Sequence, residues 1–115
     1  MKRTLVGLRR IPEDELVLKD ARYLALMEVD LLALYRRWGR PDIAADDLAE
    51  WLCFAFSLPN GDKFALQREA EHPPTSGFLL SVTAGLFSAE AAEQVAAALD
   101  VPVVRVLEVS ADAAR

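Results

Sequence analysis

The densest group of potentially reactive side chains in this 115-residue sequence is a run of carboxylates between residues 42 and 50. The run consists of Asp42, Asp46, Asp47 and Glu50. Carboxylate oxygens can bind Mg²⁺ or Ca²⁺, but this run lacks the alternating Asp/Asn spacing of a calcium-binding loop. On a helix, residues 46, 47 and 50 would share a face. We interpret the run either as a solvated helix face or as an acidic surface that contacts a partner protein.

His72 is the only histidine in the sequence and Cys53 is the only cysteine. A metal site needs several nitrogen, sulfur or oxygen ligands at defined spacing, and no such set accompanies either residue. A Cys–His nucleophile pair needs a thiolate, whose formation the apolar run around Cys53 opposes. We expect His72 to lie in an exposed loop and Cys53 to be buried in the core.

Phosphate-binding and acyl-transfer motifs are absent from the sequence. The five glycines are scattered without a G-x-G-x-x-G or G-x-x-x-x-G-K-[ST] pattern, and no serine lies in a G-x-S-x-G segment. We therefore expect no enzymatic activity, no cofactor and no metal.

Glu28 is the one carboxylate that falls beside apolar residues if its segment is helical. An unpaired buried charge is costly, so Glu28 must reach water or find a donor, such as Tyr35 or an arginine from elsewhere in the chain. A catalytic acid with a perturbed pKa is the alternative, but no other residue supports it.

Length and composition indicate one domain. We expect residues 1–109 to form it, with residues 110–115 as a loose tail. The hydrophobic fraction of 53% is sufficient for a core, and no apolar run reaches the roughly 18 residues that span a bilayer. A single cysteine cannot form an intrachain disulfide, so the cytoplasm is the expected compartment.

Charge is distributed unevenly along the chain. Residues 1–40 carry nine Lys or Arg and six Asp or Glu, whereas residues 41–115 carry four and twelve, so the two parts have balances of +3 and −8. The net charge of −5 argues against broad electrostatic binding of nucleic acid. We interpret the imbalance either as two differently solvated faces of one domain or as an acidic face offered to a basic partner protein.

Residue patterns predict a helix from Ala21 to Trp38, capped by Asp20. Residues 42–58 are ambiguous: we favour a helix through Trp51, but residues 52–58 also alternate as a strand would. The other predicted elements are strands at 4–8, 16–18, 63–69, 78–83 and 103–109 and a helix at 89–99 capped by Ser88.

These elements predict an α+β fold. We expect a mixed, mostly antiparallel sheet with two to three helices mainly on one face. A ferredoxin-like sandwich with an extra element is the most economical arrangement. The strands at 63–69 and 78–83 should be antiparallel, and the strand at 103–109 should lie in the sheet interior.

The predicted helix at 21–38 has an apolar strip on its nominally polar side. Leu26, Val29 and Ala33 line this strip, and Arg36 and Arg37 lie at its rim. Either the helix is buried on both sides, or the strip is a contact with a partner or with a second copy in a homodimer.

The residue patterns favour two functions over an enzyme of unfamiliar design that would use Glu28, His72 or the Asp46, Asp47 and Glu50 group. The first is a small acidic protein-binding module that acts by surface occlusion, such as an immunity protein, antitoxin or inhibitor of a basic toxin or enzyme. The alternative is a homo-oligomeric accessory or small-ligand-binding domain of ferredoxin-like type, with a pocket lined by Phe64, Phe78, Trp51 and Tyr35.

Overall fold

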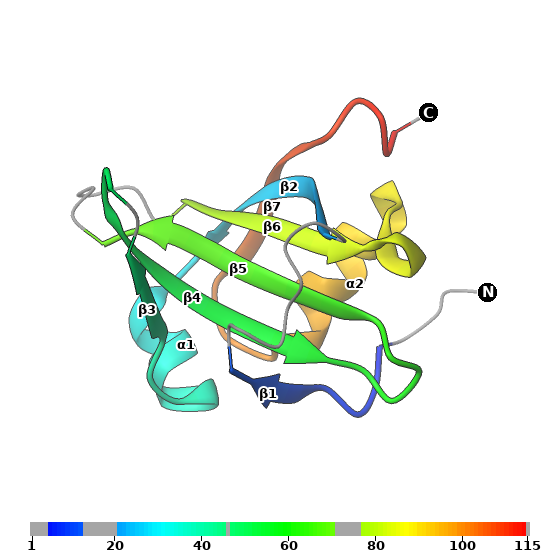
Figure 1. Cartoon of the computed structure of the whole chain (residues 1–115). Helices are drawn as coiled ribbons and strands as arrows, with labels where there is room; N and C mark the ends of the chain where they lie inside the picture. Colours follow the sequence, from blue (N-terminus) through cyan, green and yellow to red (C-terminus); the bar gives the residue numbers. More distant parts are fainter. Residues whose placement is uncertain (1–4, 13–20, 46, 71–76, 115) are drawn as a thin grey trace.

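The computed structural model describes residues 5–12, 21–45, 47–70 and 77–114. These residues form an α+β fold in which two α-helices and one short 3-10 helix accompany a seven-stranded sheet (Figure 1). In chain order the elements are Arg9–Ile11 (β1), Ala21–Val29 (β2), Leu31–Trp38 (α1), Asp42–Ala45 (β3), Glu50–Ser57 (β4), Lys63–Glu69 (β5), Gly77–Thr83 (β6), Ala84–Leu86 (η3), Ala89–Ala98 (α2) and Val104–Val109 (β7).

All strand pairs among the described residues are antiparallel. The strand order is β1-β4-β5-β6-β2-β7, and β3 also pairs with β4, beside β1. Strand β2 is antiparallel to both of its neighbours, so β6 and β7 run in the same direction on either side of it. The predicted antiparallel pairing is confirmed, but the predicted mixed character is not seen, since no parallel pair occurs among the described strands. The interior position predicted for the last strand is wrong, because β7 is at the end of the sheet.

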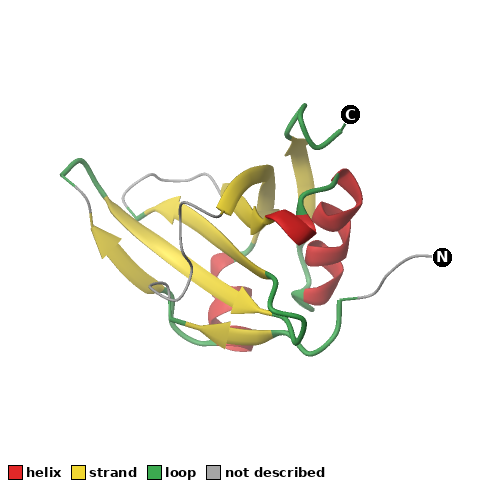
Figure 2. Cartoon of the chain, turned by 45° about the vertical axis from the view of Figure 1, so that its right-hand side comes forward, coloured by secondary structure: helices red, strands yellow, loops and turns green. Residues whose placement is uncertain are grey.

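The two α-helices lie on one face of the sheet (Figures 1 and 2). Leu34 of α1 and Val95 of α2 are fully buried in the same hydrophobic cluster as alternate residues of the strands. The bulkiest fully buried side chains of this cluster are Phe54, Phe56, Phe64 and Phe78. A smaller buried cluster on the opposite face contains Ile11, Cys53, Ala55 and Ala65. We call that opposite face the open face.

The helix predicted from residue 21 to residue 38 is wrong in its first half. Ala21–Val29 is a strand, and α1 begins at Leu31. Strand β2 pairs with β6 on one side and β7 on the other, and Leu24, Ala25, Met27 and Val29 are fully buried in it. The apolar residues of this segment form a nearly continuous run, and periodicity alone does not distinguish such a run in a strand from one in a buried helix.

The start of α1 is set by Asp30. Its side-chain oxygen accepts a hydrogen bond from the Leu32 backbone N–H at 3.0 Å, which satisfies one of the unpaired donors of the first turn. The cap predicted at Asp20 and the strand predicted at 16–18 lie outside the described residues.

The helix favoured for residues 42–51 is also wrong. Asp42–Ala45 and Glu50–Ser57 form a β-hairpin, with Ala45 opposite Glu50. The strand alternative for residues 52–58 is confirmed over its length to Ser57. Tertiary pairing decides this segment, because β4 lies between β5 and the β1/β3 edge.

The second half of the chain follows the predictions closely. Strands β5 and β6 are antiparallel, with Leu66 opposite Leu80. Ser88 caps α2, since its Oγ accepts a hydrogen bond from the Ala91 backbone N–H at 3.1 Å. Near the N-terminus, the described part of the strand predicted at 4–8 is not a strand, and β1 lies at Arg9–Ile11 instead.

Candidate functional site

The described residues contain no group of three or more His, Cys, Asp or Glu side chains that could hold a metal ion. Cys53 is fully buried, as predicted, in the small cluster on the open face. His72 lies outside the described residues.

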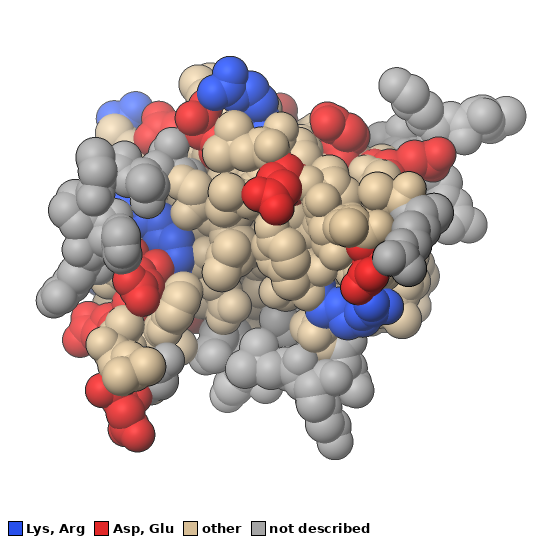
Figure 3. Space-filling model, turned by 90° about the horizontal axis from the view of Figure 1, so that it is seen from above, with Lys and Arg blue, Asp and Glu red and all other residues tan. Residues whose placement is uncertain are grey.

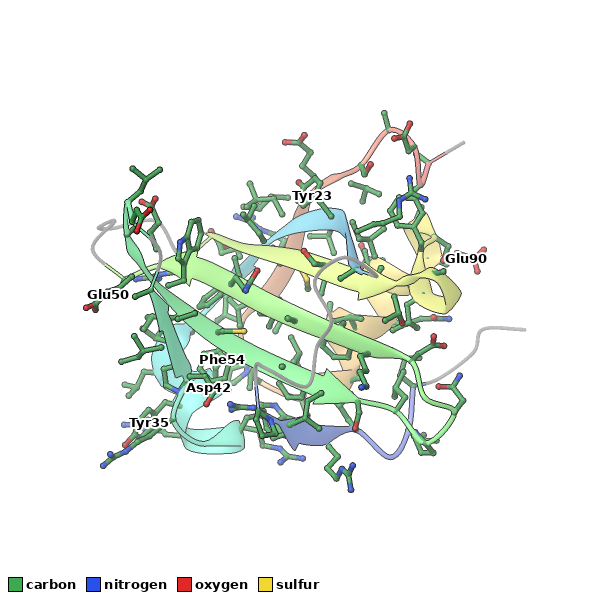
Figure 4. All side chains as sticks on the ribbon, viewed as in Figure 1. Tyr23, Tyr35, Asp42, Glu50, Phe54 and Glu90 are labelled. Carbon is green, nitrogen blue, oxygen red and sulfur yellow. The ribbon has the colours of Figure 1, made fainter. Side chains whose placement is uncertain are left out.

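The acidic run lies on the β3–β4 hairpin. Asp42 is at its base, half-buried, whereas Asp47 and Glu50 are exposed at the turn; Asp46 lies outside the described residues. Leu48, between the two exposed carboxylates, is 94% exposed. Asp42 and Glu50 lie at opposite ends of the hairpin (Figure 4), and acidic side chains gather on the side of the molecule where the hairpin lies (Figure 3).

The base of this hairpin is fixed by Arg10 of β1. Its Nη1 donates hydrogen bonds to the carbonyl oxygens of Trp38 at 3.3 Å and of Arg40 at 3.2 Å. Its Nη2 lies 3.7 Å from Asp42 Oδ2, and the guanidinium carbon is 5.1 Å from the ring centroid of Phe54. A cation at the C-terminal end of α1 also complements the helix dipole. Sequence patterns gave no signal for this role.

Glu28 has the arginine partner that its position requires. Arg105 Nη2 lies 3.1 Å from Glu28 Oε1, and the two residues face each other across β2 and β7. The Glu28 side chain is 32% exposed and that of Arg105 is 69% exposed. Because the pair is in contact with water, it gives no sign of a buried catalytic acid.

The apolar strip predicted on a helix does not form. Leu26 and Val29 lie on β2, where odd spacing places them on opposite faces of the sheet. Val29 is fully buried in the core, so it cannot contact a partner. Leu26 lies on the open face, opposite Leu79 of β6.

The open face carries an apolar patch where β6, β2 and β7 meet. Tyr23, Leu79 and Leu107 are 40%, 39% and 46% exposed, and Leu26 is half-buried among them. Burial and, to a smaller extent, the nearby Glu108 carboxylate raise the pKa of the Tyr23 phenol. Seen from above, the molecule has a broad uncharged surface with scattered charged groups (Figure 3). We refer to Tyr23, Leu26, Leu79 and Leu107 as the open-face patch.

The arginines at the end of α1 have different surroundings. Arg37 Nε lies 3.6 Å from Asp100 Oδ2, and its guanidinium carbon is 4.1 Å from the ring centroid of Trp38. Arg36 is exposed in the same helical turn. Arg37 therefore has contacts within the chain, and both arginines are exposed.

An open depression of about 560 Å³ lies between the β4–β5 turn and the start of α2. Asp62 at its edge is held in place, since its carboxylate accepts hydrogen bonds from the Thr83 hydroxyl and the Asn60 amide, both at 3.0 Å. Of the residues predicted to line a pocket, Phe64 and Phe78 are fully buried in the core, whereas Tyr35 is 43% exposed.

Comparisons with protein-family models, with curated proteins and with solved structures found no match for this chain. Neither of the described α-helices has the length and apolar composition needed to cross a membrane.

Proposed function

We propose that this protein is a small acidic protein-binding module that acts by surface occlusion, as an immunity protein, an antitoxin or an inhibitor does. The observation that supports the proposal most directly is the turn of the β3–β4 hairpin. There Leu48 is 94% exposed, and the carboxylates of Asp47 and Glu50 lie exposed on either side of it along the chain.

The exposed leucine supplies binding energy in this proposal. Burying a leucine side chain contributes about 1.5–3 kcal/mol. The Arg10 contacts at the base of the hairpin hold it against the end of α1, which lowers the ordering cost of binding. A basic partner surface with an apolar pocket is the complement of this turn, and the carboxylates would speed and orient the encounter.

The partner is therefore expected to be another protein, such as a basic toxin or enzyme. In this proposal the chain itself is not an enzyme and uses no cofactor. Nucleic acid is not its target, because the surface it would use is acidic.

The test is affinity capture from the native cell with wild type, Leu48→Asp and Val6→Asp proteins, followed by mass spectrometry. Val6 is 68% exposed and lies near the N-terminus, away from the hairpin, so it is a matched control. We expect the partner to be retained by wild type and Val6→Asp and to be lost, by about tenfold or more in affinity, with Leu48→Asp. Equal retention of every captured protein by all three would overturn the proposal.

A second candidate is the homo-oligomeric accessory or small-ligand-binding domain of ferredoxin-like type. The observation in its favour is the strand order β7-β2-β6-β5, with α1 following β2 and α2 joining β6 to β7. This is a β-α-β-β-α-β arrangement, to which β1 and the β3–β4 hairpin would be additions. The depression beside α2 is the place for a small ligand in this candidate.

The two candidate functions predict opposite effects of two substitutions on binding. A small ligand in the depression would be displaced by Gln94→Trp, which adds bulk to its lining, and would be unaffected by Leu48→Asp. Capture of a partner protein through the hairpin should be weakened by Leu48→Asp and unaffected by Gln94→Trp.

A further inference from the structure

The two edges of the sheet differ in how they are protected. At one end, β1 and β3 both pair with β4 and cover it with two short segments. At the other end, β7 pairs with β2 on one side, and no described strand lies on its other side. Such an edge presents N–H and C=O groups that can pair with another strand.

Strand β7 contains a bulge that determines which side chains share a face. Leu26 is opposite Glu108 and Met27 is opposite Val106, so Leu107 is the extra residue. Arg105, Leu107 and Glu108 are all exposed, while Val104, Val106 and Val109 are half-buried. The bulge thus brings Arg105 and Glu108 to the open face together.

We propose that β7 pairs antiparallel with β7 of a second copy of this chain, about a two-fold axis at Val106. Such an interface is self-complementary. Val106 then lies opposite Val106 of the partner subunit, and Val104 lies opposite Val109 of the partner subunit. On the open face, Arg105 lies opposite the bulge of the second copy and reaches Glu108 of the partner subunit.

The charge pattern supports this register. In a strand without the bulge, an axis at Val106 would place Arg105 opposite leucine and would put Glu108 on the other face. With the bulge, the same axis brings Arg105 of each copy to Glu108 of the other, which gives two Arg–Glu contacts. Each Arg105 also keeps its Glu28 partner in its own chain at 3.1 Å. The contribution of Glu108 to the raised pKa of Tyr23 is consistent with its place on the open face.

Pairing would also cover exposed apolar surface. Val103 and Leu107 are 51% and 46% exposed beside this edge. In the dimer the Leu107 side chains would lie beside the two Arg–Glu contacts on the open face and would lose part of their exposure. Bulges and charges can also protect an edge against pairing, and the experiment separates that outcome from dimerisation.

The experiment measures the molar mass of the full chain by sedimentation equilibrium over a wide concentration range. Three single variants are compared with wild type: Arg105→Glu, Glu108→Arg and, as a matched control on the exposed side of α2, Glu93→Arg. We expect wild type and Glu93→Arg to dimerise. Either β7 variant alone should dissociate, with the dissociation constant raised by about tenfold or more.

Mixing the two β7 variants provides the decisive result. An Arg105→Glu chain and a Glu108→Arg chain restore both Arg–Glu contacts in a mixed dimer, whereas each variant alone places like charges opposite each other. Recovery of the dimer on mixing is expected. A wild type that stays monomeric at all concentrations, or a dimer that neither variant weakens, would overturn the proposal. Circular dichroism checks that each variant is folded.

Discussion

The indole Nε1 of Trp38 donates a hydrogen bond to the carbonyl oxygen of Leu99 at 2.8 Å and so joins the end of α1 to the end of α2. The same ring packs edge-on against Phe56, with centroids 5.2 Å apart. Each helix is short, with 8 residues in α1 and 10 in α2. Helices of this length depend on tertiary contacts for their stability, so this single bond connects two elements that need support.

Trp38→Phe should therefore destabilise the protein. The substitution keeps an aromatic ring against Phe56. It removes the indole N–H, which donates the hydrogen bond to the Leu99 carbonyl oxygen. We expect a loss of about 1–3 kcal/mol in the free energy of unfolding, because a part-buried acceptor loses its partner. Chemical denaturation followed by circular dichroism measures it, with Leu32→Ala on the exposed side of α1 as the control. An unchanged midpoint would contradict the role assigned to this bond.

Arg10→Lys should loosen the hairpin without changing the net charge. An ammonium group is a compact point charge and cannot reach the carbonyl oxygens of Trp38 and Arg40 and the Asp42 carboxylate together. We expect a loss of about 1–2 kcal/mol in stability. Hydrogen exchange should show faster exchange in β1 and β3 than in β6. Uniform acceleration across the sheet would mean that Arg10 stabilises the fold as a whole and does not anchor the hairpin.

The parts of the fold that the sequence predicts well are those fixed by local chemistry. Ser88 caps a helix because a hydroxyl at that position satisfies a backbone donor, and the β5–β6 pair follows from the alternation of its residues. The helix predicted over residues 21–29 is a strand, because pairing with β6 and β7 decides its conformation and this pairing is not visible in the local pattern of apolar residues.

In the candidate sites, too, local chemistry could be predicted from the sequence, whereas contacts set by strand pairing could not. That Glu28 requires a donor follows from the cost of an unpaired charge, but the identity of Arg105 depends on the pairing of β2 with β7. The carboxylates between residues 42 and 50 are close in sequence, but the hairpin separates Asp42 from Glu50 in space. Arg10 could not be recognised, because its acceptors are backbone carbonyls, which every residue possesses.

Gly85→Ala should be destabilising for a steric reason. A Cβ at this position would lie 2.5 Å from Asp62 Oδ1 and 2.8 Å from Asp62 Cγ. The carboxylate cannot simply move away, because the Thr83 hydroxyl and the Asn60 amide hold it. We expect a loss of about 1–3 kcal/mol, as for other overpacked positions.

A double-mutant cycle tests this explanation. Removing the carboxylate with Asp62→Ala costs its hydrogen bonds but also removes the obstacle, so Gly85→Ala should cost less in the Asp62→Ala background than in wild type. Strictly additive losses in the free energy of unfolding would show that the two residues do not interfere.

Tyr23 should titrate above the usual tyrosine value of 10.0, because burial and the Glu108 carboxylate both disfavour the phenolate. A Tyr35→Phe background removes the second tyrosine, so the tyrosinate absorbance then reports Tyr23 alone. Glu108→Gln should lower the pKa of Tyr23 only in part, since burial is the larger cause. A titration at the ordinary value in this background would contradict the assigned surroundings.

The same shift determines the sign of a stability effect at high pH. The folded state holds the phenolic proton more tightly than the unfolded chain, so the contribution of Tyr23 is fully present below a pH of about 10. It is lost as the pH rises through the raised pKa of the folded state. Thermal unfolding at alkaline pH should therefore show a smaller loss of stability for Tyr23→Phe than for wild type. Between neutral pH and the onset of this titration, the stabilities of the two proteins should change with pH by the same amount. A wild type that loses no more stability than Tyr23→Phe above that onset would exclude the linkage.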